Sequence, residues 1–372
     1  MPVYIYQLKD WPHFTWDQER IAPKLAEVRH NQGRLLGRME GLGFIFKSEA
    51  NLHTLTLDVL KSSEIEGEIL NPDQVRSSIA RRLGMDIAGL VPADRHVEGV
   101  VEMMLDATQR YHDALTHDRL FDWHAAMFPT GLSGIHTIVI GRYRNNTPDD
   151  PMQVVSGPMG REKVHFQAPD SDVLQYEMTR LLDWFNTNDK LDSVLKAALA
   201  HLWFVTIHPF DDGNGRIARA ITDMQLSRAD QSKQRFYSMS SQIRTERKGY
   251  YDILEKTQEG SLDVTEWLDW FLNCLGRALA NTNETLGAVL QKARFWEKHS
   301  RTALNDRQRI MLNKLLDGFE GKLTSSKWAK ITKTSQDTAG RDITDLLNKD
   351  ILIKEPGGGR STSYLLKDLT EE

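Results

Sequence analysis

Residues 208–219, which read HPFDDGNGRIAR, constrain the fold of this 372-residue chain more than any other stretch. Upstream, apolar residues recur at three- and four-residue spacing, which predicts the buried face of a helix: Leu195, Ala198, Leu199, Leu202 and Val205. Downstream, Ile217, Ala220, Ile221 and Met224 repeat the helical period. Pro209 cannot continue a helix. The stretch is therefore predicted to form a turn between two helices, and the second helix begins inside it.

The predicted turn has the chemistry of an anion site. Gly213 and Gly215 allow bare main chain to approach a ligand. The N-terminus of the second helix offers unpaired N–H groups and the positive end of the helix dipole. Arg216 and Arg219 are three residues apart on one face, and their guanidinium groups suit phosphate oxygens. These four residues predict a site for a polyphosphate.

Two further side chains complete a candidate for catalysis. Asp212 suits a hard cation such as Mg²⁺ held against phosphates. His208, at the mouth of the turn, has a proton affinity suited to a general base near neutral pH. Each residue alone is also compatible with an ordinary helix end or cap. Their co-occurrence favours a nucleotide-phosphate site with a base.

The same stretch matches every position of the signature H-x-F-x-[D/E]-G-N-G-R-x-x-R, and in this the chain resembles the Fic-domain protein adenylyltransferase family. The resemblance implies a helical fold that transfers AMP from ATP, with Mg²⁺, to a hydroxyl side chain of a target protein. It also implies roles for the matching residues: His208 as general base, Asp212 as Mg²⁺ ligand, Gly213, Asn214, Gly215 and Arg216 as the phosphate-binding group, and Arg219 as the clamp on the γ-phosphate.

A second informative stretch lies upstream, where an apolar stripe on a predicted helix ends in polar residues before a glycine: Leu52, Leu55, Val59, Ser62, Glu66 and Gly67. A carboxylate that continues a buried face needs a cation or donor. Arg219 is the candidate partner. Alternatively, the helix end emerges into water and leaves Glu66 exposed, and periodicity alone leaves both interpretations open.

Ser62, Glu66 and Gly67 resemble the inhibitory motif [S/T]-x-x-x-E-[G/N] of many Fic proteins. The resemblance is to the subclass whose inhibitory helix precedes the core in the same chain. It implies that Glu66 pairs with Arg219 and blocks productive placement of ATP.

Local patterns predict the remaining elements of the first 270 residues. Asn71 and Pro72 predict a helix cap and first turn, and helical patterns follow at 96–116 and 119–127. Strands are predicted at 137–140 and 164–166, where residues 163–166 resemble the edge of the Fic hairpin flap that holds a target segment; an ordinary surface hairpin is the alternative. Tyr250 and Tyr251 resemble tyrosines that border the nucleotide base, with packing as the alternative.

Residues 306–365 resemble a winged helix-turn-helix, with helices predicted near 306–317, 325–332 and 334–349 and then a hairpin across a glycine-rich turn at 356–359. Thr334 is predicted to open the recognition helix. From residue 300 onward, 13 basic and 11 acidic residues leave a net charge of only +2, which is a weak footprint for DNA. DNA contact is therefore open, and protein contact or dimerisation is favoured.

The predicted fold is mainly α: a Fic-type helical core with a short β-hairpin flap, an N-terminal helical region and a C-terminal winged helix-turn-helix. The predicted domains are 1–95 with the inhibitory motif, 96–290 as the core, and 300–372. A formal charge of −5 gives no overall attraction to nucleic acid or anionic membrane. Lys9 and Asp10 interrupt any signal-peptide core, and no run reaches membrane-spanning length, so a cytoplasmic protein without membrane contact is expected.

Three functions follow from these patterns. The first is a protein adenylyltransferase that modifies a Ser, Thr or Tyr hydroxyl on a target, with self-modification as one option, and that is autoinhibited by Glu66. The second uses the same pocket to remove AMP from a modified protein. The third is a nucleotide-sensing, DNA-binding regulator. The sequence leaves the oligomeric state open, a homodimer included.

Overall fold

The computed structural model describes residues 3–85, 89–147, 149–157, 161, 163–187, 190–319, 321–355 and 362–367. The chain is mainly α-helical, as predicted. Its helices up to residue 298 are α1 (Gln18–Glu40), α2 (Phe44–Ile65), α3 (Pro72–Arg82), α4 (Arg95–Gln109), α5 (His117–Met127), α6 (Leu174–Asn186), α7 (Ser193–Ile207), α8 (Asn214–Asp230), α9 (Met239–Thr245), α10 (Arg247–Gln258) and α11 (Thr265–Lys298). Short 3-10 helices are η1 (Ile5–Gln7) and η2 (Ser171–Val173).

The chain divides into two compact units. The first contains residues 1–85 and 91–283, and the second contains residues 86–90 and 284–372, so that the boundary falls inside α11. The predicted division into 1–95, 96–290 and 300–372 stays a prediction.

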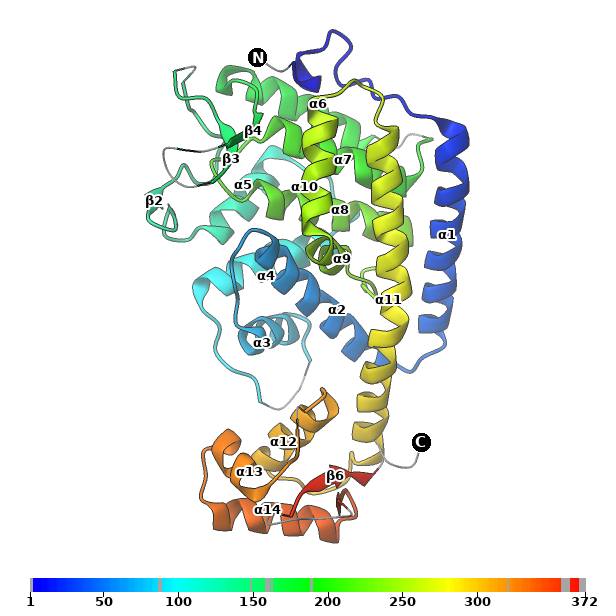
Figure 1. Ribbon diagram of the computed structural model, residues 1–372, viewed down its shortest axis with the longest axis vertical. Helices are drawn as coiled ribbons and strands as arrows, with labels where there is room; N and C mark the ends of the chain where they lie inside the picture. The colour runs from blue at the N-terminus through cyan, green and yellow to red at the C-terminus, as the bar shows by residue number, and fades with distance from the viewer. Residues whose placement is uncertain are drawn as a thin grey trace. The chain divides into compact units, whose positions relative to one another are not determined.

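Helices α7 and α8 form the interior of the first unit (Figure 1). Every residue from 194 to 207 is buried, which is expected of a helix that is apolar on all sides. Helix α8 packs against α7 and is buried from residue 216 to 227. The two helices predicted around residues 208–219 are thus present, and the turn between them is held by the most buried part of the unit.

Helix α4 is shorter than the 96–116 predicted, because the next helix supplies a different partner for its last carbonyl groups. The Arg119 guanidinium of α5 donates to the main-chain oxygens of Asp106, Arg110, Asp113 and Ala114. Thr116 has extended main chain and caps α5 by accepting from the Arg119 N–H. These contacts end α4 at Gln109 and turn the chain into α5.

The strands form three two-stranded antiparallel sheets. They are β1 (Leu132–Ser133) with β2 (His136–Thr137), β3 (Gln153–Ser156) with β4 (Lys163–Gln167), and β5 (Leu352–Lys354) with β6 (Tyr364–Leu366). The strand predicted at 137–140 is only the end of β2. The strand predicted at 164–166 is β4, but its partner β3 was not predicted, since Gln153 and Ser156 give it no apolar alternation. We call β3 and β4 the hairpin.

The N-terminal segment packs beside the hairpin. Tyr4 is buried, and its ring meets Phe166 of β4 edge to face at 4.9 Å between centroids. Tyr6 stacks on Tyr4. The aromatic start of the chain therefore braces the apolar side of the hairpin.

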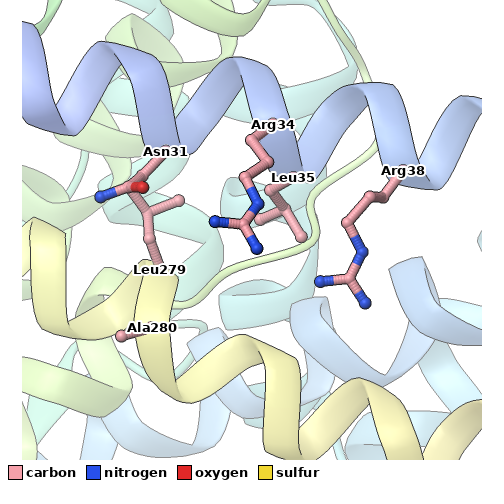
Figure 2. A pocket seen from close by; sticks show the side chains of 6 residues that line it. All are labelled: Asn31, Arg34, Leu35, Arg38, Leu279 and Ala280. Carbon is pink, nitrogen blue, oxygen red and sulfur yellow. The ribbon is translucent and has the colours of Figure 1, made fainter.

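Helix α1 lies beside α11 within the first unit. A cleft of about 130 Å³ between them is lined by Asn31, Arg34, Leu35, Arg38, Leu279 and Ala280. Figure 2 shows the two arginine side chains extending from α1 into this cleft. None of its lining residues belongs to the turn between α7 and α8.

The second unit contains α12 (Asp306–Leu316), α13 (Ser325–Thr332) and α14 (Gln336–Asn348), followed by β5 and β6. They enclose a core that includes Trp328, Ile343 and Leu366. Ser335, not Thr334, caps α14, because its hydroxyl accepts from the Thr338 N–H. The predicted turn at 356–359 lies outside the described residues, and the winged-helix interpretation stays a prediction.

No helix in the described part of the chain combines the length and the apolar character needed to cross a bilayer.

Replacing Gly99 with alanine is expected to destabilise the protein. A Cβ at this position of α4 would overlap the main-chain carbonyl of Ala126 in α5, so that the two helices must separate. Such overpacking costs roughly 1–3 kcal/mol of unfolding free energy or more. Gly37→Ala in α1 is the matched control, since a Cβ there meets open space, and it should stabilise by about 0.5–1 kcal/mol. Urea denaturation of both variants tests the packing, and a Gly99→Ala midpoint equal to that of the parent contradicts it.

Candidate active site

The turn between α7 and α8 is built from two left-handed residues. His208 ends α7 with φ 50° and ψ 60°, and Gly213 precedes α8 with φ 81°. Between them, Phe210 is fully buried. The Asn214 side chain donates to the Phe210 carbonyl at 2.7 Å and accepts from the Phe210 N–H at 2.9 Å. Asn214, predicted to bind phosphate, therefore uses its side-chain amide to close the turn.

His208 has the protonation state that a base requires. Burial lowers its pKa to about 4, so the ring is neutral at physiological pH. Nδ1 lies 3.3 Å from the Val205 carbonyl oxygen, which only accepts, so Nδ1 carries the proton. Nε2 is then the nitrogen with the free lone pair.

Arg144 fixes the main chain at His208. It is buried, and it donates from Nε to the His208 carbonyl at 2.8 Å and from Nη2 to Pro169 and Ile207 carbonyls at 2.6 and 3.3 Å. Its own N–H donates to the Pro209 carbonyl at 2.9 Å. Burial lowers the pKa of Arg144 to about 10, so it remains a cation at the carbonyl end of α7.

His124 holds the other side of the turn. Its ring stacks on Phe210 at 4.3 Å, Nδ1 accepts from the Gly141 N–H, and Nε2 donates to the Asp212 carbonyl at 3.2 Å. Burial lowers its pKa to about 4, which agrees with a neutral ring that both donates and accepts. The His124 side chain therefore acts as a brace for the turn.

Asp212 is the site's accessible carboxylate, with 41% of its side chain exposed. Oδ2 accepts from the Ser133 hydroxyl, and Oδ1 accepts from the Gly213 N–H. The described residues contain no group of three metal-ligating side chains. Since Mg²⁺ at phosphates commonly uses one or two carboxylates and water, a single exposed aspartate fits that ion.

Arg219 is buried and bound to the end of α2. Nε donates to the Ser62 hydroxyl at 2.8 Å, and Nη2 donates to the Ser62 carbonyl at 2.8 Å and to Glu66 Oε1 at 2.7 Å. The arginine side chain is 2% exposed and that of Glu66 28%. The contact predicted between Glu66 and Arg219 is present, and its effect on activity is a separate question.

Glu66 also sits over the start of α8. A Cβ at position 215 would overlap Glu66 Oε1, so glycine there makes room for the carboxylate. The first bond within α8 runs from the Ile217 N–H to the Gly213 carbonyl, and the N–H groups of residues 214–216 precede it. A carboxylate therefore occupies the place where a helix N-terminus attracts an anion.

Tyr250 and Tyr251 lie on α10 at one side of the same cavity. Tyr250 is buried, and its hydroxyl bonds with His201 Nε2 at 2.7 Å, which is a packing role. Tyr251 is more accessible: its hydroxyl lies 3.5 Å from Glu66 Oε2, and the Arg247 guanidinium covers its ring at 5.4 Å. Of the two, Tyr251 is the better placed to touch a ligand.

Several of these groups line one cavity of about 830 Å³, a size typical of small-ligand sites, whereas Arg144, Arg216 and Arg219 are not among its lining residues. Its walls are the end of α2, the hairpin, the turn with the start of α8, and α10. Figure 1 shows the hairpin, α8 and α10 in the same part of the first unit. The lining residues include Glu66, His165, His208, Asp212, Gly215 and Tyr251.

Two family models match the chain. Residues 4–85 match a domain of unknown function (DUF4172), and residues 114–226, which include the turn and most of α8, match the Fic/DOC family. The chain is a Fic-family protein.

Curated relatives of this Fic protein are named protein adenylyltransferases. The Fic proteins of Culex quinquefasciatus and Aedes aegypti are each 28% identical over 226 residues, which is 59% of this chain and 40% of theirs. A relative from Caenorhabditis elegans is 28% identical over 187 residues, 47% of this chain and 32% of its own. The match thus spans about two fifths of the first two relatives' length.

Solved structures share the fold. A Fic family protein from Desulfovibrio desulfuricans G20 aligns over 96% of this chain and 98% of its own with a TM-score of 0.54. A Fic domain containing signaling protein from Bacteroides thetaiotaomicron aligns over 74% of this chain and 97% of its own, with a TM-score of 0.50. Each is 20% identical, so the likeness concerns the fold.

Sequence reasoning about this Fic protein missed Arg144 and His124. The sequence predicts no role for Arg144, and it predicts residues 119–127 only as a helix. The available signal was an arginine in a glycine-rich segment without an acidic neighbour before Asp149. Such an arginine is suited to main-chain carbonyls, but the sequence does not say which ones.

Arg144→Met in this Fic protein is expected to cost about 3 kcal/mol of unfolding free energy, because three buried carbonyls lose a charged donor. Arg142→Met is the matched control, since Arg142 is an exposed arginine of the same segment and its loss should be nearly neutral. Denaturation midpoints of the two variants provide the test, and equal midpoints would show that Arg144 does not brace the turn.

Proposed function

We propose that this Fic protein transfers AMP from ATP to a Ser, Thr or Tyr hydroxyl of a target protein. The observation that carries the proposal is one cavity lined both by a neutral imidazole, His208, and by an anion-binding helix N-terminus at Gly215. Transfer of AMP to a hydroxyl needs a base that takes the hydroxyl proton and a site that binds the phosphates. The names of the curated relatives agree with this activity.

The proposed reaction follows from the neutral His208 ring, whose Nε2 can accept a proton. The target hydroxyl gives its proton to His208 Nε2 while its oxygen attacks the α-phosphorus of ATP. The new oxygen–phosphorus bond replaces the bond to the β-phosphate oxygen, and pyrophosphate leaves. Main-chain N–H groups of residues 214–216 and the two motif arginines, Arg216 and Arg219, stabilise the phosphate charge.

The hairpin would present the target. Among the described residues its two strands pair only with each other, and Val155 and Val164 expose 48% and 43% of their surface. A two-stranded sheet has open edges that accept a further strand, which would bring a hydroxyl side chain over the cavity. Self-modification would use the same route from a second copy of the chain.

Asp212 would hold Mg²⁺ at the phosphates, which supplies charge neutralisation when bound. Asp212 lines the cavity and 41% of its side chain is exposed, which suits an ion shared with a substrate. Tyr251 and Arg247 would border the nucleotide base, with Tyr250 packed behind them.

Glu66 would inhibit the resting enzyme. Its carboxylate occupies the helix N-terminus over Gly215 and takes up Nη2 of Arg219. A triphosphate that needs the same N–H groups must displace it. Removal of AMP by a water oriented on Glu66 is the second candidate, favoured by the accessibility of this carboxylate from the cavity.

His208→Ala is expected to reduce AMP transfer to about one per cent of the parent or less, since a positioned base contributes roughly 10²–10⁴-fold. ATP binding should stay near the parent value, because the base acts on the chemical step. Mass spectrometry of AMP adducts measures the transfer. His208→Ala and its control variant are both made in a Glu66→Gly background. His30→Ala, at an exposed site on α1, is the control. Transfer of several per cent in a folded His208→Ala variant would reject the base assignment.

Glu66→Gly is expected to raise the initial rate of AMP incorporation at least tenfold at saturating ATP, because Arg219 and the start of α8 become free for phosphate. Loss of the partly buried pair is expected to lower the free energy of unfolding by up to about 3 kcal/mol. Arg219→Ala should not activate, since it removes the inhibitory contact and the phosphate clamp together.

The pair of variants separates specific inhibition from a general loosening of α2. Activation by both would indicate loosening. An unchanged rate in a folded Glu66→Gly variant rejects autoinhibition, and if removal of AMP from a modified protein also falls, Glu66 belongs to that reverse reaction instead.

A further inference from the structure

A second carboxylate binds Arg216, the first arginine of the motif. The Arg216 side chain is 4% exposed, and its Nη1 donates to Glu68 Oε2 at 2.7 Å. The guanidinium also lies 5.1 Å from the centroid of the Phe128 ring. The Glu68 side chain is 33% exposed, so its far side is open to water.

Glu68 is held between two cations. His96 Nδ1 lies 3.0 Å from the Met127 carbonyl oxygen, and its Nε2 contacts Glu68 Oε1. Since both ring nitrogens face acceptors, the imidazolium form satisfies both, and Glu68 accordingly raises the pKa of His96. Burial pulls the pKa of Glu68 upward, but His96 and Arg216 outweigh it and the pKa lies below its usual value. Glu68 is therefore a carboxylate fixed by charge on two sides.

The end of helix α2 explains why two glutamates reach two arginines. The Gly67 N–H donates to the Glu64 carbonyl at 3.1 Å and the Glu68 N–H to the Ser63 carbonyl at 3.0 Å, with Gly67 at φ 86°. This is the Schellman arrangement that stops a helix. It places Glu66 before the left-handed glycine and Glu68 after it, while Arg216 and Arg219 stand one turn apart on α8.

Each arginine keeps at least one buried guanidinium nitrogen without a hydrogen bond. Within the described residues, Arg216 Nε and Arg219 Nη1 are buried and lack a hydrogen-bond partner. Buried N–H groups of a cation that stay unpaired are costly, so the site is incomplete as folded. The two glutamates neutralise the formal charge of the arginines but do not accept from all their N–H groups. The oxygens of a polyphosphate could accept from the remaining ones.

We propose that Glu68 is a second competing carboxylate, which holds Arg216 away from the nucleotide phosphates and is itself positioned by His96. The inference rests on the proposed nucleotide site and extends it to a second ion pair. Glu66 competes with phosphate for Arg219, and Glu68 competes with phosphate for Arg216. A ligand with more phosphates depends more strongly on Arg216, so the displacement of Glu68 affects the binding of that ligand more. Glu68 therefore tunes the affinity of the site for polyphosphates rather than for nucleosides.

The test is the dissociation constant of ATP, ADP, AMP and adenosine, measured by calorimetry with Mg²⁺ on the full chain. Glu68→Gln keeps the shape and removes the charge. We expect its ATP dissociation constant to fall about tenfold, that of ADP to fall less, and that of adenosine to stay unchanged. Glu64→Gln is the matched control: Glu64 ends the same helix but pairs with Lys61 and Arg244, and it should change nothing.

Three results with Glu68→Gln overturn the inference: an ATP dissociation constant within twofold of the parent value, a higher ATP dissociation constant, or an equal fall in the adenosine dissociation constant. A higher constant would mean that Glu68 orients Arg216 for phosphate. In an Arg216→Met background Glu68→Gln should be silent, and a remaining gain would show that it acts elsewhere. Glu68→Asp, which keeps the charge but shortens the reach, should shift ATP binding in the same direction and replaces Glu68→Gln if that variant does not fold.

Parallel assays of AMP incorporation separate this inference from the proposed function. Tighter ATP binding in Glu68→Gln with no transfer in any variant, Glu66→Gly included, supports the Arg216 assignment and refutes the transferase. Transfer in Glu66→Gly with unaltered ATP binding in Glu68→Gln does the reverse.

Discussion

The unpaired N–H groups at the start of α8 are the constraint on which the site depends. A helix N-terminus inside a cavity favours an anion, and here the Glu66 carboxylate lies over it, in the space left by the absence of a side chain at Gly215. Arg219 binds the same carboxylate from the next turn of the helix. The start of α8 and Arg219 thus both face a carboxylate from the end of α2.

The opposite helix end poses the complementary problem, because the last carbonyls of α7 need donors. Arg144 supplies them at Ile207 and His208, and the hydrogen bonds hold His208 in a left-handed conformation that an ordinary residue rarely adopts. His124 and Asn214 secure the rest of the turn. His208 is thus presented by main-chain geometry fixed from outside the turn, and burial keeps its ring neutral.

The sequence predicted the parts of this arrangement that are local. The helices around residues 208–219 follow from spacing, and the stripe that ends in Ser62 and Glu66 gave the contact with Arg219 as one of two open interpretations. The contacts of Arg144 and Glu68 were not predicted, because each residue binds a segment far away in the chain. Arg144 binds the end of α7, and Glu68 binds Arg216. The early end of α4 escaped for the same reason, since Arg119 of the following helix takes over its carbonyls. Periodicity reports which face is buried, but not which group meets it.

Exposure distinguishes the ion pairs that can exchange from those that only stabilise. Arg235 and Asp223 are 0% and 1% exposed, and opening this pair would leave two charges without water, so it is permanent structure. Glu66 and Glu68 are 28% and 33% exposed, and water can replace the arginine when either carboxylate swings away. The main-chain bonds that end α2 do not involve these carboxylates. Rotation of the two glutamate side chains would therefore open both ion pairs while the helix end stays folded, and Ser62 would still hold Arg219 through its hydroxyl and its carbonyl.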